Sequence, residues 1–422
     1  MSERKFLADV ASTLGTRVLM IVNSVAAGII VAHWLGAKGV GELAVINVAV
    51  TTIVQLGSFG LPSSNTYFIA QDRAHFRAAV VNSFLCAALA GSILTVALSV
   101  VAWVRPDWFG FVPPELIRIA ALSIPFQLVT LIGLNILLAL GKLREFNLLD
   151  LASQSFVLVN ALVILIVLGL GLDALVKLNT ATSVLVSLVV VVLLVAAGKQ
   201  FVGSQWRADA ALLRRMISYG LKFHISVLAG AIIFRADLLV VNHFRGATEA
   251  GVYSVATQFG MLLMLLPSVI ATLLFPRVTA EQDAHGETTW QVTKHTALIM
   301  LVCCLAAVPL SFLLPLVYGA AFSEVTTLLL ILLPGVYLIG LESVLVQHFS
   351  ALGLPRTIPV YWIVTLVVNL VLVFALVPQF GAYGAAIAST VSYALIFALV
   401  TFYFLATTRR SVMATARGSL RG

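Results

Sequence analysis

The sequence predicts an all-α protein that crosses a membrane about twelve times and folds as two parallel six-helix repeats around a central cavity. The first observation behind this prediction is composition. Of the 422 residues, 61% are hydrophobic and only 10% are charged, and the mean hydropathy is +1.09. A soluble domain carries about 25% charged residues, because its surface faces water. The other two observations are long apolar runs and motifs that return half a chain later.

The apolar runs predict the individual membrane helices, since about 20 apolar residues are needed to cross a bilayer core of about 30 Å. In the first half of the chain they lie near 14–34, 43–62, 78–103, 116–140, 147–170 and 174–197. In the second half they lie near 223–243, 249–275, 295–318, 325–349, 358–378 and 383–406. These runs predict an N-terminal six-helix bundle over 1–200, a cytoplasmic linker over 201–222, a C-terminal bundle over 223–408 and a basic cytoplasmic tail over 409–422.

The second half of the predicted linker belongs to a segment, 209–223, whose apolar residues recur at helical spacing. Arg214 and Arg215 stand together on one side of it. This pattern is typical of an amphipathic helix at a membrane surface. An ordinary basic loop explains the same residues, and both interpretations stay open.

Charge distribution predicts the orientation of the chain. When the loops are assigned alternately to the two sides, eighteen Lys and Arg residues fall on the side of the N-terminus and five on the other. Positive charge collects on the cytoplasmic side of membrane proteins. The sequence therefore predicts a multi-pass membrane protein with both termini cytoplasmic. The net charge of +8 is assigned to these loops and to contacts with membrane lipid, and no nucleic-acid partner is expected.

An internal repeat supports the two-bundle architecture. LGAKGVGELAV (35–45) matches FRGATEAGVYSV (244–255), so that Gly36 pairs with Gly246 at an offset of 210 residues. ALGKLR (139–144) matches ALGLPR (351–356), and Thr180 pairs with Thr390. Because six helices return the chain to the side on which it started, the repeats are parallel, related by an axis along the membrane normal.

Three segments resemble one protein family. They are LGAKGVGELAVINVAVTTIVQLGSFGL (35–61), FRADLLVVNHFRGATEAGVYSVATQFGMLLMLLPSVIATLLFPRVT (234–279) and GLPRTIPVYWIVTLVVNLVLVFALVPQFGAYGAAIAST (353–390). They resemble the polysaccharide-biosynthesis, O-antigen type, flippases of the multidrug/oligosaccharidyl-lipid/polysaccharide (MOP) exporter superfamily. The resemblance implies a MATE-like fold and translocation of an undecaprenyl-pyrophosphate-linked oligosaccharide across the inner membrane by alternating access. It also implies a role in O-antigen, capsule or exopolysaccharide synthesis, with polysaccharide polymerase or export machinery as partner.

Charged residues inside apolar runs are the first candidate site residues, because such a residue costs at least about 2.5–3.5 kcal/mol at the membrane centre. Arg17 is a candidate ligand for the pyrophosphate, with snorkelling to the inner headgroups as the alternative. Arg235 is the first choice for binding the anionic head group. Asp237 is a candidate for ion coupling, with a structural interhelical network as the alternative. Two residues apart on a helix, Arg235 and Asp237 point in different directions, so each needs its own partner.

Further candidates are less charged. Glu342 and His224 are candidates for ion coupling, and for His224 and His348 an interfacial hydrogen bond is the simpler interpretation. Neutral polar side chains that can line a cavity for sugars include Asn23, Asn47, Gln55 and Gln258. Asn47 and Gln55 belong to a polar stripe along the predicted second helix, which indicates a wet face or helix–helix hydrogen bonding.

Two other classes of protein remain as alternatives. A MATE-type multidrug or cation antiporter shares the superfamily, but its cavity should favour acids over arginines. A membrane glycan polymerase or ligase needs a sizeable outer loop with catalytic residues, and the longest predicted outer loop, 105–118, has little polar chemistry. The sequence contains no P-loop, HExxH or Gly-x-Ser-x-Gly motif. We therefore expect a transporter without catalytic residues, metal or cofactor, driven by a proton or sodium gradient or by consumption of its product.

Overall fold

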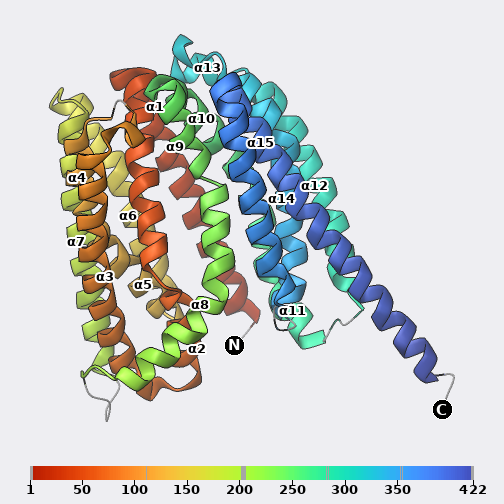
Figure 1. Ribbon diagram of the computed structural model, residues 1–422. Coiled ribbons are helices and arrows are strands. Elements are labelled where there is room, and N and C mark those ends of the chain that lie inside the picture. Colours follow the sequence, from red (N-terminus) through yellow and green to blue (C-terminus); the bar gives the residue numbers. More distant parts are fainter. Residues whose placement is uncertain are drawn as a thin grey trace. The chain divides into compact units, whose positions relative to one another are not determined.

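The computed structural model describes residues 3–110, 112–200, 206–281, 283, 285–351, 353 and 355–419. Among these residues every regular element is helical (Figure 1). The chain divides into two compact units. The first contains residues 1–231 together with 246–251, and the second contains residues 232–245 and 252–422. Packing therefore groups residues 223–231 with the first unit, whereas hydropathy starts the second predicted bundle at residue 223.

The helices follow the apolar runs. Up to residue 233 they are α1 (Glu3–Gly57), α2 (Leu61–Gln71), η1 (Arg73–His75), α3 (Phe76–Val104), η2 (Pro106–Phe109), α4 (Pro114–Ala121), α5 (Ile124–Ala139), α6 (Leu143–Ala161), η3 (Leu162–Val167), α7 (Leu172–Gly198) and α8 (Ala210–Ile233). The remaining helices are α9 (Ala236–Arg245), α10 (Ala247–Leu263), α11 (Leu265–Glu281), α12 (Glu287–Ser311), α13 (Leu314–Tyr318), η4 (Ala320–Phe322), α14 (Val325–Ala351) and α15 (Thr357–Ser419).

Nine helices in the described part of the chain are long and apolar enough to cross a membrane. The number is ten if α4 and α5, which meet at a bend of 41°, form one span. Two of the nine contain a glycine with non-helical dihedral angles, Gly36 in α1 and Gly381 in α15, where two helices join across a kink. The all-α membrane fold is thus confirmed, while the count of twelve stays a prediction that requires each kinked helix to cross twice and α4 and α5 to form one span.

Small residues set the packing distances inside the first unit. A Cβ atom on Gly91 of α3 would lie 2.6 Å from the Pro125 Cα of α5. A Cβ on Gly133 of α5 would overlap the Val190 side chain of α7. Lipid is as apolar as a leucine side chain, so membrane helices associate through close packing and hydrogen bonds rather than through the hydrophobic effect. Glycine at these crossings lets the neighbouring helices approach that closely.

The segment 209–223, for which a helix and a loop were both open, is helical from residue 210 and continues into the predicted seventh span as α8. Its buried residues Leu212, Met216 and Gly220 recur every four positions. Met216 and Gly220 face α2, where Ser64 Oγ donates a hydrogen bond of 2.5 Å to the Met216 carbonyl. Arg214 and Arg215 are exposed. The helix therefore has a packed face and a basic face.

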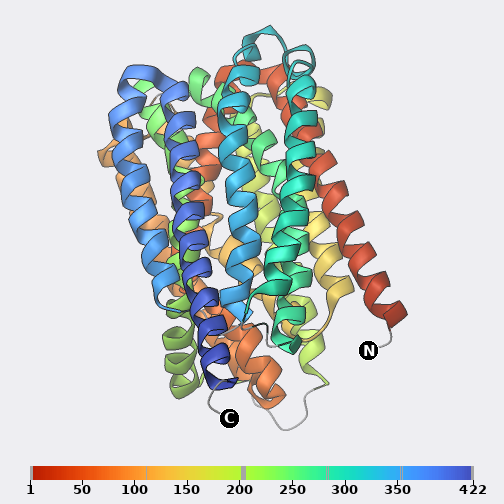
Figure 2. The ribbon, with the colours of Figure 1, turned by 90° about the vertical axis from the view of Figure 1, so that its right-hand side faces the viewer.

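In the second unit, α14 packs against α11, α12 and α15, and Figure 2 shows these helices running alongside one another. Ile339 and Leu345 of α14 and Phe404 of α15 belong to one buried apolar cluster. A Cβ on Gly335 would lie 2.7 Å from the Thr390 Cα. The most buried span of this unit is thus a helix surrounded by protein rather than by lipid.

The paired glycines of the sequence repeat have matching backbone conformations. Gly36 and Gly246 both have positive φ, at 66° and 89°. Gly141 and Gly353 have φ values of 74° and 106°. Only glycine adopts this region without strain. Equivalent turns in the two halves therefore require glycine for the same reason.

Two hydrogen bonds also repeat. Thr180 Oγ1 donates to the Ile119 carbonyl at 3.4 Å, and Thr390 Oγ1 donates to the Ile331 carbonyl at 2.7 Å. Asn160 donates to Thr182 at 3.0 Å, and Asn369 donates to Ser392 at 3.1 Å. Partners offset by about half the chain make the same bond in each half, which confirms the internal repeat.

Candidate functional site

Arg17 forms an ion pair in the first unit. Its Nη1 atom lies 2.9 Å from Oδ2 of Asp150, on α6. The Arg17 side chain is 38% exposed and that of Asp150 is 17% exposed. Asp150 is thus the more protected member of the pair and Arg17 the more accessible one. A guanidinium has five N–H donors in a planar fork, and within the described part of the chain the contacts of Arg17 to Asp150 and Met20 are made by Nη1. The other N–H groups of the Arg17 guanidinium can therefore donate hydrogen bonds to an anion.

The ion pair belongs to a seam of polar contacts between α1 and α6. Asn147 Nδ2 donates to Thr13 Oγ1 at 3.0 Å. Asn23 Nδ2 donates to Ser155 Oγ at 2.8 Å. Partner numbers rise together along both helices, so α1 and α6 run parallel. Two odd-numbered membrane spans must run in the same direction, as the alternating loop assignment predicts.

Sequence reasoning singled out Arg17 and Asn23 but not their partners. Asp150 is an acid within the apolar run 147–170, and an ionisable residue in such a run is a recognisable signal. Its pairing with Arg17, 133 positions earlier, has no local signature. Ser155 and Asn147 are ordinary polar residues until the fold places them against α1.

Arg235 and Asp237 lie at a break between α8 and α9, in the second unit. Arg235 occupies the turn and is exposed, whereas Asp237 is 2% exposed. The Asp237 carboxylate accepts hydrogen bonds from Tyr253 Oη at 2.5 Å, from Ser389 Oγ at 2.8 Å and from the Leu238 amide at 2.8 Å. Asp237 thus ties α9 to α10 and α15 in a network between helices. A structural network of this kind is the alternative to ion coupling that the sequence offered for Asp237.

Glu342 and His224 are the other buried candidates, one in each unit. Glu342 lies in α14 and is 2% exposed, and its Oε1 atom has no hydrogen-bond partner among the described residues. A buried polar atom without a partner is unusual and calls for an explanation. His224 lies in α8, where its ring bonds to the Leu56 backbone and its Nε2 atom lacks a partner in the described part of the chain.

His348, in the second unit, makes the interfacial bond that the simpler interpretation predicted. Its Nδ1 atom lies 3.1 Å from Thr289 Oγ1. Thr289 in turn donates from its backbone amide to Asp283 at 3.1 Å. The ring also packs edge-on against Phe404. His348 thus joins α12 to α14.

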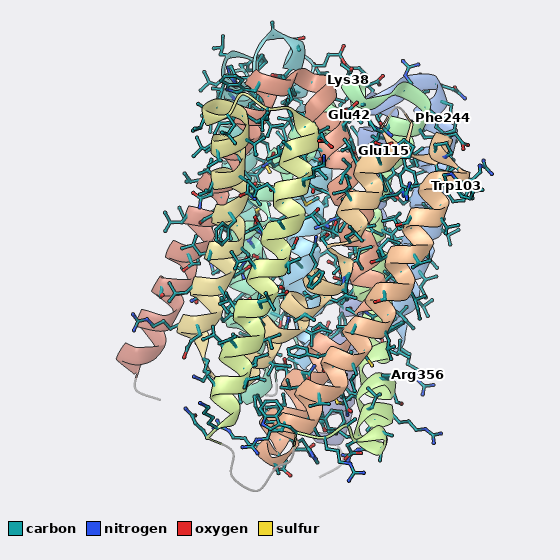
Figure 3. All side chains as sticks on the ribbon, turned by 90° about the vertical axis from the view of Figure 1, so that its left-hand side faces the viewer. Lys38, Glu42, Trp103, Glu115, Phe244 and Arg356 are labelled. Atoms are coloured by element: carbon teal, nitrogen blue, oxygen red, sulfur yellow. The ribbon has the colours of Figure 1, made fainter. Side chains whose placement is uncertain are left out.

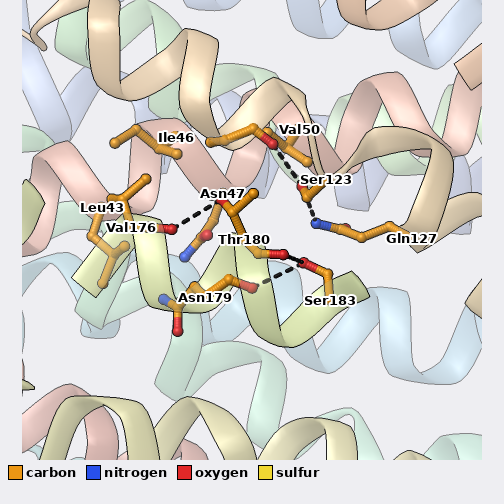
Figure 4. A pocket seen from close by; sticks show the side chains of 11 residues that line it. Leu43, Ile46, Asn47, Val50, Ser123, Gln127, Val176, Asn179, Thr180 and Ser183 are labelled. Carbon is orange, nitrogen blue, oxygen red and sulfur yellow. Dashed lines mark hydrogen bonds between the residues drawn. The ribbon is translucent and has the colours of Figure 1, made fainter. Parts of the chain in front are cut away.

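A small pocket with a cavity volume of about 40 Å³, partly open to its surroundings, lies within the first unit (Figure 4). Its polar side chains come from α1, from the junction of α4 and α5, and from α7. They are Asn47, Ser123, Gln127, Asn179, Thr180 and Ser183. Gln127 Nε2 donates to Ser123 Oγ at 2.8 Å. Amides and hydroxyls without a charged residue suit neutral polar groups.

Of the predicted cavity residues in the first unit, only Asn47 lines this pocket. Arg17 and Asn23 face α6 instead, and Gln55 is half-buried near the end of α1, where its carbonyl accepts from Ser58 Oγ. Gln258 is half-buried in α10, in the second unit. Asparagine and threonine side chains of α7 complete the pocket. They were not singled out because small polar side chains in a largely apolar run, 174–197, are as consistent with helix–helix hydrogen bonding as with a pocket.

Residues of the predicted loops lie at the ends of each unit. In the first unit, Lys38, Glu42 and Glu115 lie toward the same end (Figure 3), and Lys38 Nζ is 3.8 Å from Glu42 Oε1. In the second unit, Phe244 and Arg356 lie at opposite ends (Figure 3). Loops expected on opposite membrane sides are thus at opposite ends.

No group of three His, Cys, Asp or Glu residues that could hold a metal ion occurs within the described ranges.

Comparisons with known proteins identify the family and the fold. Residues 4–282 match the family described as "Polysaccharide biosynthesis protein". The succinoglycan biosynthesis transport protein ExoT of Rhizobium meliloti is 29% identical over 251 residues, which cover 58% of this chain and 48% of ExoT. Matches to the curated relatives span about half of their lengths or less.

Solved structures with a similar fold are transporters. The inward-closed lipid II flippase MurJ superposes with a TM-score of 0.75 at 15% identity, covering 96% of this chain and 91% of MurJ. An inward-facing multidrug MATE transporter of the MOP superfamily superposes with a TM-score of 0.67 at 15% identity, covering 95% and 99% of the two chains. The predicted transporter fold is thereby confirmed. This multi-pass membrane chain belongs to the polysaccharide biosynthesis protein family and has the all-helical fold of MOP-superfamily transporters.

Proposed function

We propose that this protein is a flippase for a lipid-linked oligosaccharide. It moves the glycan on its undecaprenyl diphosphate carrier from the cytoplasmic to the periplasmic leaflet of the bacterial inner membrane, by alternating access. The product serves synthesis of a surface polysaccharide, and a polysaccharide polymerase or export complex consumes it. The observation that carries the proposal, beside family membership, is a partly exposed arginine in a membrane span, Arg17, whose described contacts involve only its Nη1 atom.

Anionic cargo explains why an arginine is kept at this position. A charged residue in a membrane span is expensive unless it faces a partner or a wet surface. A guanidinium binds phosphate through two parallel hydrogen bonds, which fixes orientation as well as charge. Arg17 would therefore hold the diphosphate, and the exposed Arg235 is the second candidate ligand for it. The polyprenyl tail stays in lipid.

Neutral polar side chains suit the sugar part of the cargo. Asn23, Gln55 and Gln258 can offer amide groups, and Asn47 does so within the polar pocket of the first unit. Sugar hydroxyls need both donors and acceptors, and amide side chains supply both. The pocket is too small for an oligosaccharide and would take a single polar group or bound water.

Coupling to an ion gradient is assigned to the buried ionisable residues. Glu342 is favoured over Asp237 for a proton, because its Oε1 atom has no partner among the described residues, whereas Asp237 already accepts three hydrogen bonds. His224, whose Nε2 atom also lacks a partner among those residues, is the second candidate. Glu342→Gln keeps the volume but cannot exchange a proton. We expect it to abolish stimulation of transport by a pH gradient in proteoliposomes. Undiminished stimulation would assign coupling to another residue or to sodium.

The MATE-type antiporter is the second candidate, because the fold of this chain is also that of a multidrug MATE transporter. Fold likeness alone does not identify cargo. An antiporter for cationic drugs should present acids to its cargo. In the ion pair of the first unit, the arginine is instead the more exposed partner. This charge arrangement favours anionic cargo.

Deletion of the gene tests the proposal. The deletion strain should lose its surface polysaccharide and accumulate lipid-linked repeat units on the cytoplasmic side of the inner membrane. Expression of the intact chain should restore the polymer. Normal polysaccharide combined with new sensitivity to cationic drugs would replace the flippase with the antiporter.

A further inference from the structure

Asp150 is an ionisable residue to which the proposed function gives no task. It lies in the membrane span Leu143–Val167 and its carboxylate contacts the Arg17 guanidinium at 2.9 Å. An acid beside the cation that would bind an anionic headgroup opposes that binding, because like charges repel at short range. Its presence therefore needs a reason beyond neutralising an arginine.

We propose that Asp150 is a positioning residue that limits how tightly Arg17 holds the diphosphate, so that the cargo is released after crossing. The inference rests on the proposed function, since it takes the diphosphate as the ligand of Arg17. An arginine without a counter-charge in a medium of low dielectric constant would hold a diphosphate strongly. Transport requires a site that binds well enough to load and weakly enough to unload.

The geometry supports a tuning role in two ways. Asp150 engages Nη1 of Arg17 and so orients the fork, and the other guanidinium N–H groups, which contact no described residue, can donate to a second anion. Asp150 is also the more protected member of the pair, with 17% of its side chain exposed against 38% for Arg17. An approaching headgroup therefore meets the guanidinium first and the carboxylate behind it.

A purely structural role is the competing explanation, because Asp150 also joins α1 to α6. Neutral bonds flank the ion pair, from Asn147 to Thr13 and from Asn23 to Ser155, and they hold the same two helices. An Asp150→Asn substitution keeps the size of the side chain and leaves both flanking bonds in place. Loss of a helix contact would weaken binding or leave it unchanged, whereas loss of a repelling charge would strengthen it.

The experiment measures binding of farnesyl diphosphate to the purified full-length chain in nanodiscs by calorimetry. Asp150→Asn should bind the probe about fivefold more tightly than the wild type, and it should flip lipid-linked glycan more slowly in proteoliposomes. Arg17→Gln should weaken binding. The double variant Arg17→Gln/Asp150→Asn should lose the gain, because the carboxylate acts through Arg17.

Two variants serve as matched controls. Ser155→Ala removes a neutral bond of the same seam without changing charge. Asp173→Asn removes one carboxylate from an exposed pair with Lys177 on α7. Neither should tighten binding of farnesyl diphosphate.

Binding by Asp150→Asn that equals or falls below that of the wild type overturns the proposal, as does a wild type that does not bind the probe. The proposed function is judged separately, by surface polysaccharide in the deletion strain. Restored polymer together with unchanged binding by Asp150→Asn would reject the role of Asp150 and leave the flippase standing. Normal polymer in the deletion strain would reject the flippase whatever Asp150→Asn does.

Discussion

Two charged side chains within the membrane spans, Arg17 and Asp237, contact partners on other helices. Arg17 pairs with Asp150 across α1 and α6, and Asp237 accepts from Tyr253 and Ser389 across three helices. Hydropathy located Arg17 and Asp237 as unusual residues but not their partners. Whether such a residue binds cargo or holds helices together depends on how much of it stays accessible. By that criterion, Arg17 is the better candidate ligand and Asp237 the better structural anchor.

Replacement of Asp237 should destabilise the second unit. Asp237→Ala leaves the buried Tyr253 and Ser389 hydroxyls without their acceptor, at a cost of about 2 kcal/mol or more, whereas Asp237→Asn retains one acceptor oxygen and costs less. Thermal unfolding of the purified chain in detergent measures both. Asp173→Ala, at an exposed carboxylate, is the control and should change stability by less than about 0.5 kcal/mol. Equal melting temperatures for Asp237→Ala and the control would exclude a structural role for the network.

Arg235 offers the opposite test, because its side chain is exposed at a turn. Arg235→Ala should lower transport of the lipid-linked glycan without lowering the amount of folded protein. Polysaccharide yield in the complemented deletion strain measures transport, and fluorescence-detected gel filtration measures folded protein. Arg235→Lys should restore part of the activity, since it keeps the charge but not the fork. Full activity of the alanine variant would remove Arg235 from the binding site.

At the scale of elements, glycine determines which helices can touch. Gly60, with φ of 71°, directly precedes α2, and Gly220 of α8 lies against its carbonyl. This close approach brings Ser64 within bonding distance of the Met216 carbonyl and stacks Tyr67 on Tyr219. The amphipathic pattern of 209–223 predicts a helix with a basic face. It does not predict that the other face docks on α2.

Gly220→Ala should loosen this docked helix. Its Cβ would lie 2.6 Å from the Gly60 carbonyl oxygen, and such overpacking costs about 1–3 kcal/mol. Gly15→Ala is the matched control, because a Cβ there meets nothing within 4 Å and alanine favours a helix by up to about 1 kcal/mol. Thermal unfolding should separate the two variants in opposite directions. Tolerance of Gly220→Ala would contradict the backbone contact.

For the whole molecule, the repeat and the alternation of loops are the main features. Both halves place glycines with positive φ at equivalent turns and repeat two side-chain hydrogen bonds. These features belong to the internal repeat, which a comparison of the two halves of the sequence detects. Orientation in the membrane rests on the positive-inside rule alone and is a prediction.

Labelling of introduced cysteines tests the orientation. In a chain whose Cys86, Cys303 and Cys304 are replaced by alanine, Lys38→Cys should react with a membrane-impermeant maleimide added to intact spheroplasts. Arg356→Cys should react only after the membrane is opened. The expectation follows from the assignment of Lys38 to an outer loop and Arg356 to an inner loop. The reverse pattern would place both termini outside.

Local composition was sufficient to determine the membrane class, most helix positions, the internal repeat and the family resemblance, because hydropathy, periodicity and motif spacing are properties of contiguous residues. The partners of Arg17, Asn23 and Asp237 were decided only by the tertiary structure, as were the pocket around Asn47 and the docking of α8 on α2. Each of these contacts joins residues far apart in the chain, and in a lipid environment it depends on close packing and hydrogen-bond geometry rather than on apolar pattern. Apolar pattern brings a helix into the membrane, but it does not specify which neighbour the helix packs against.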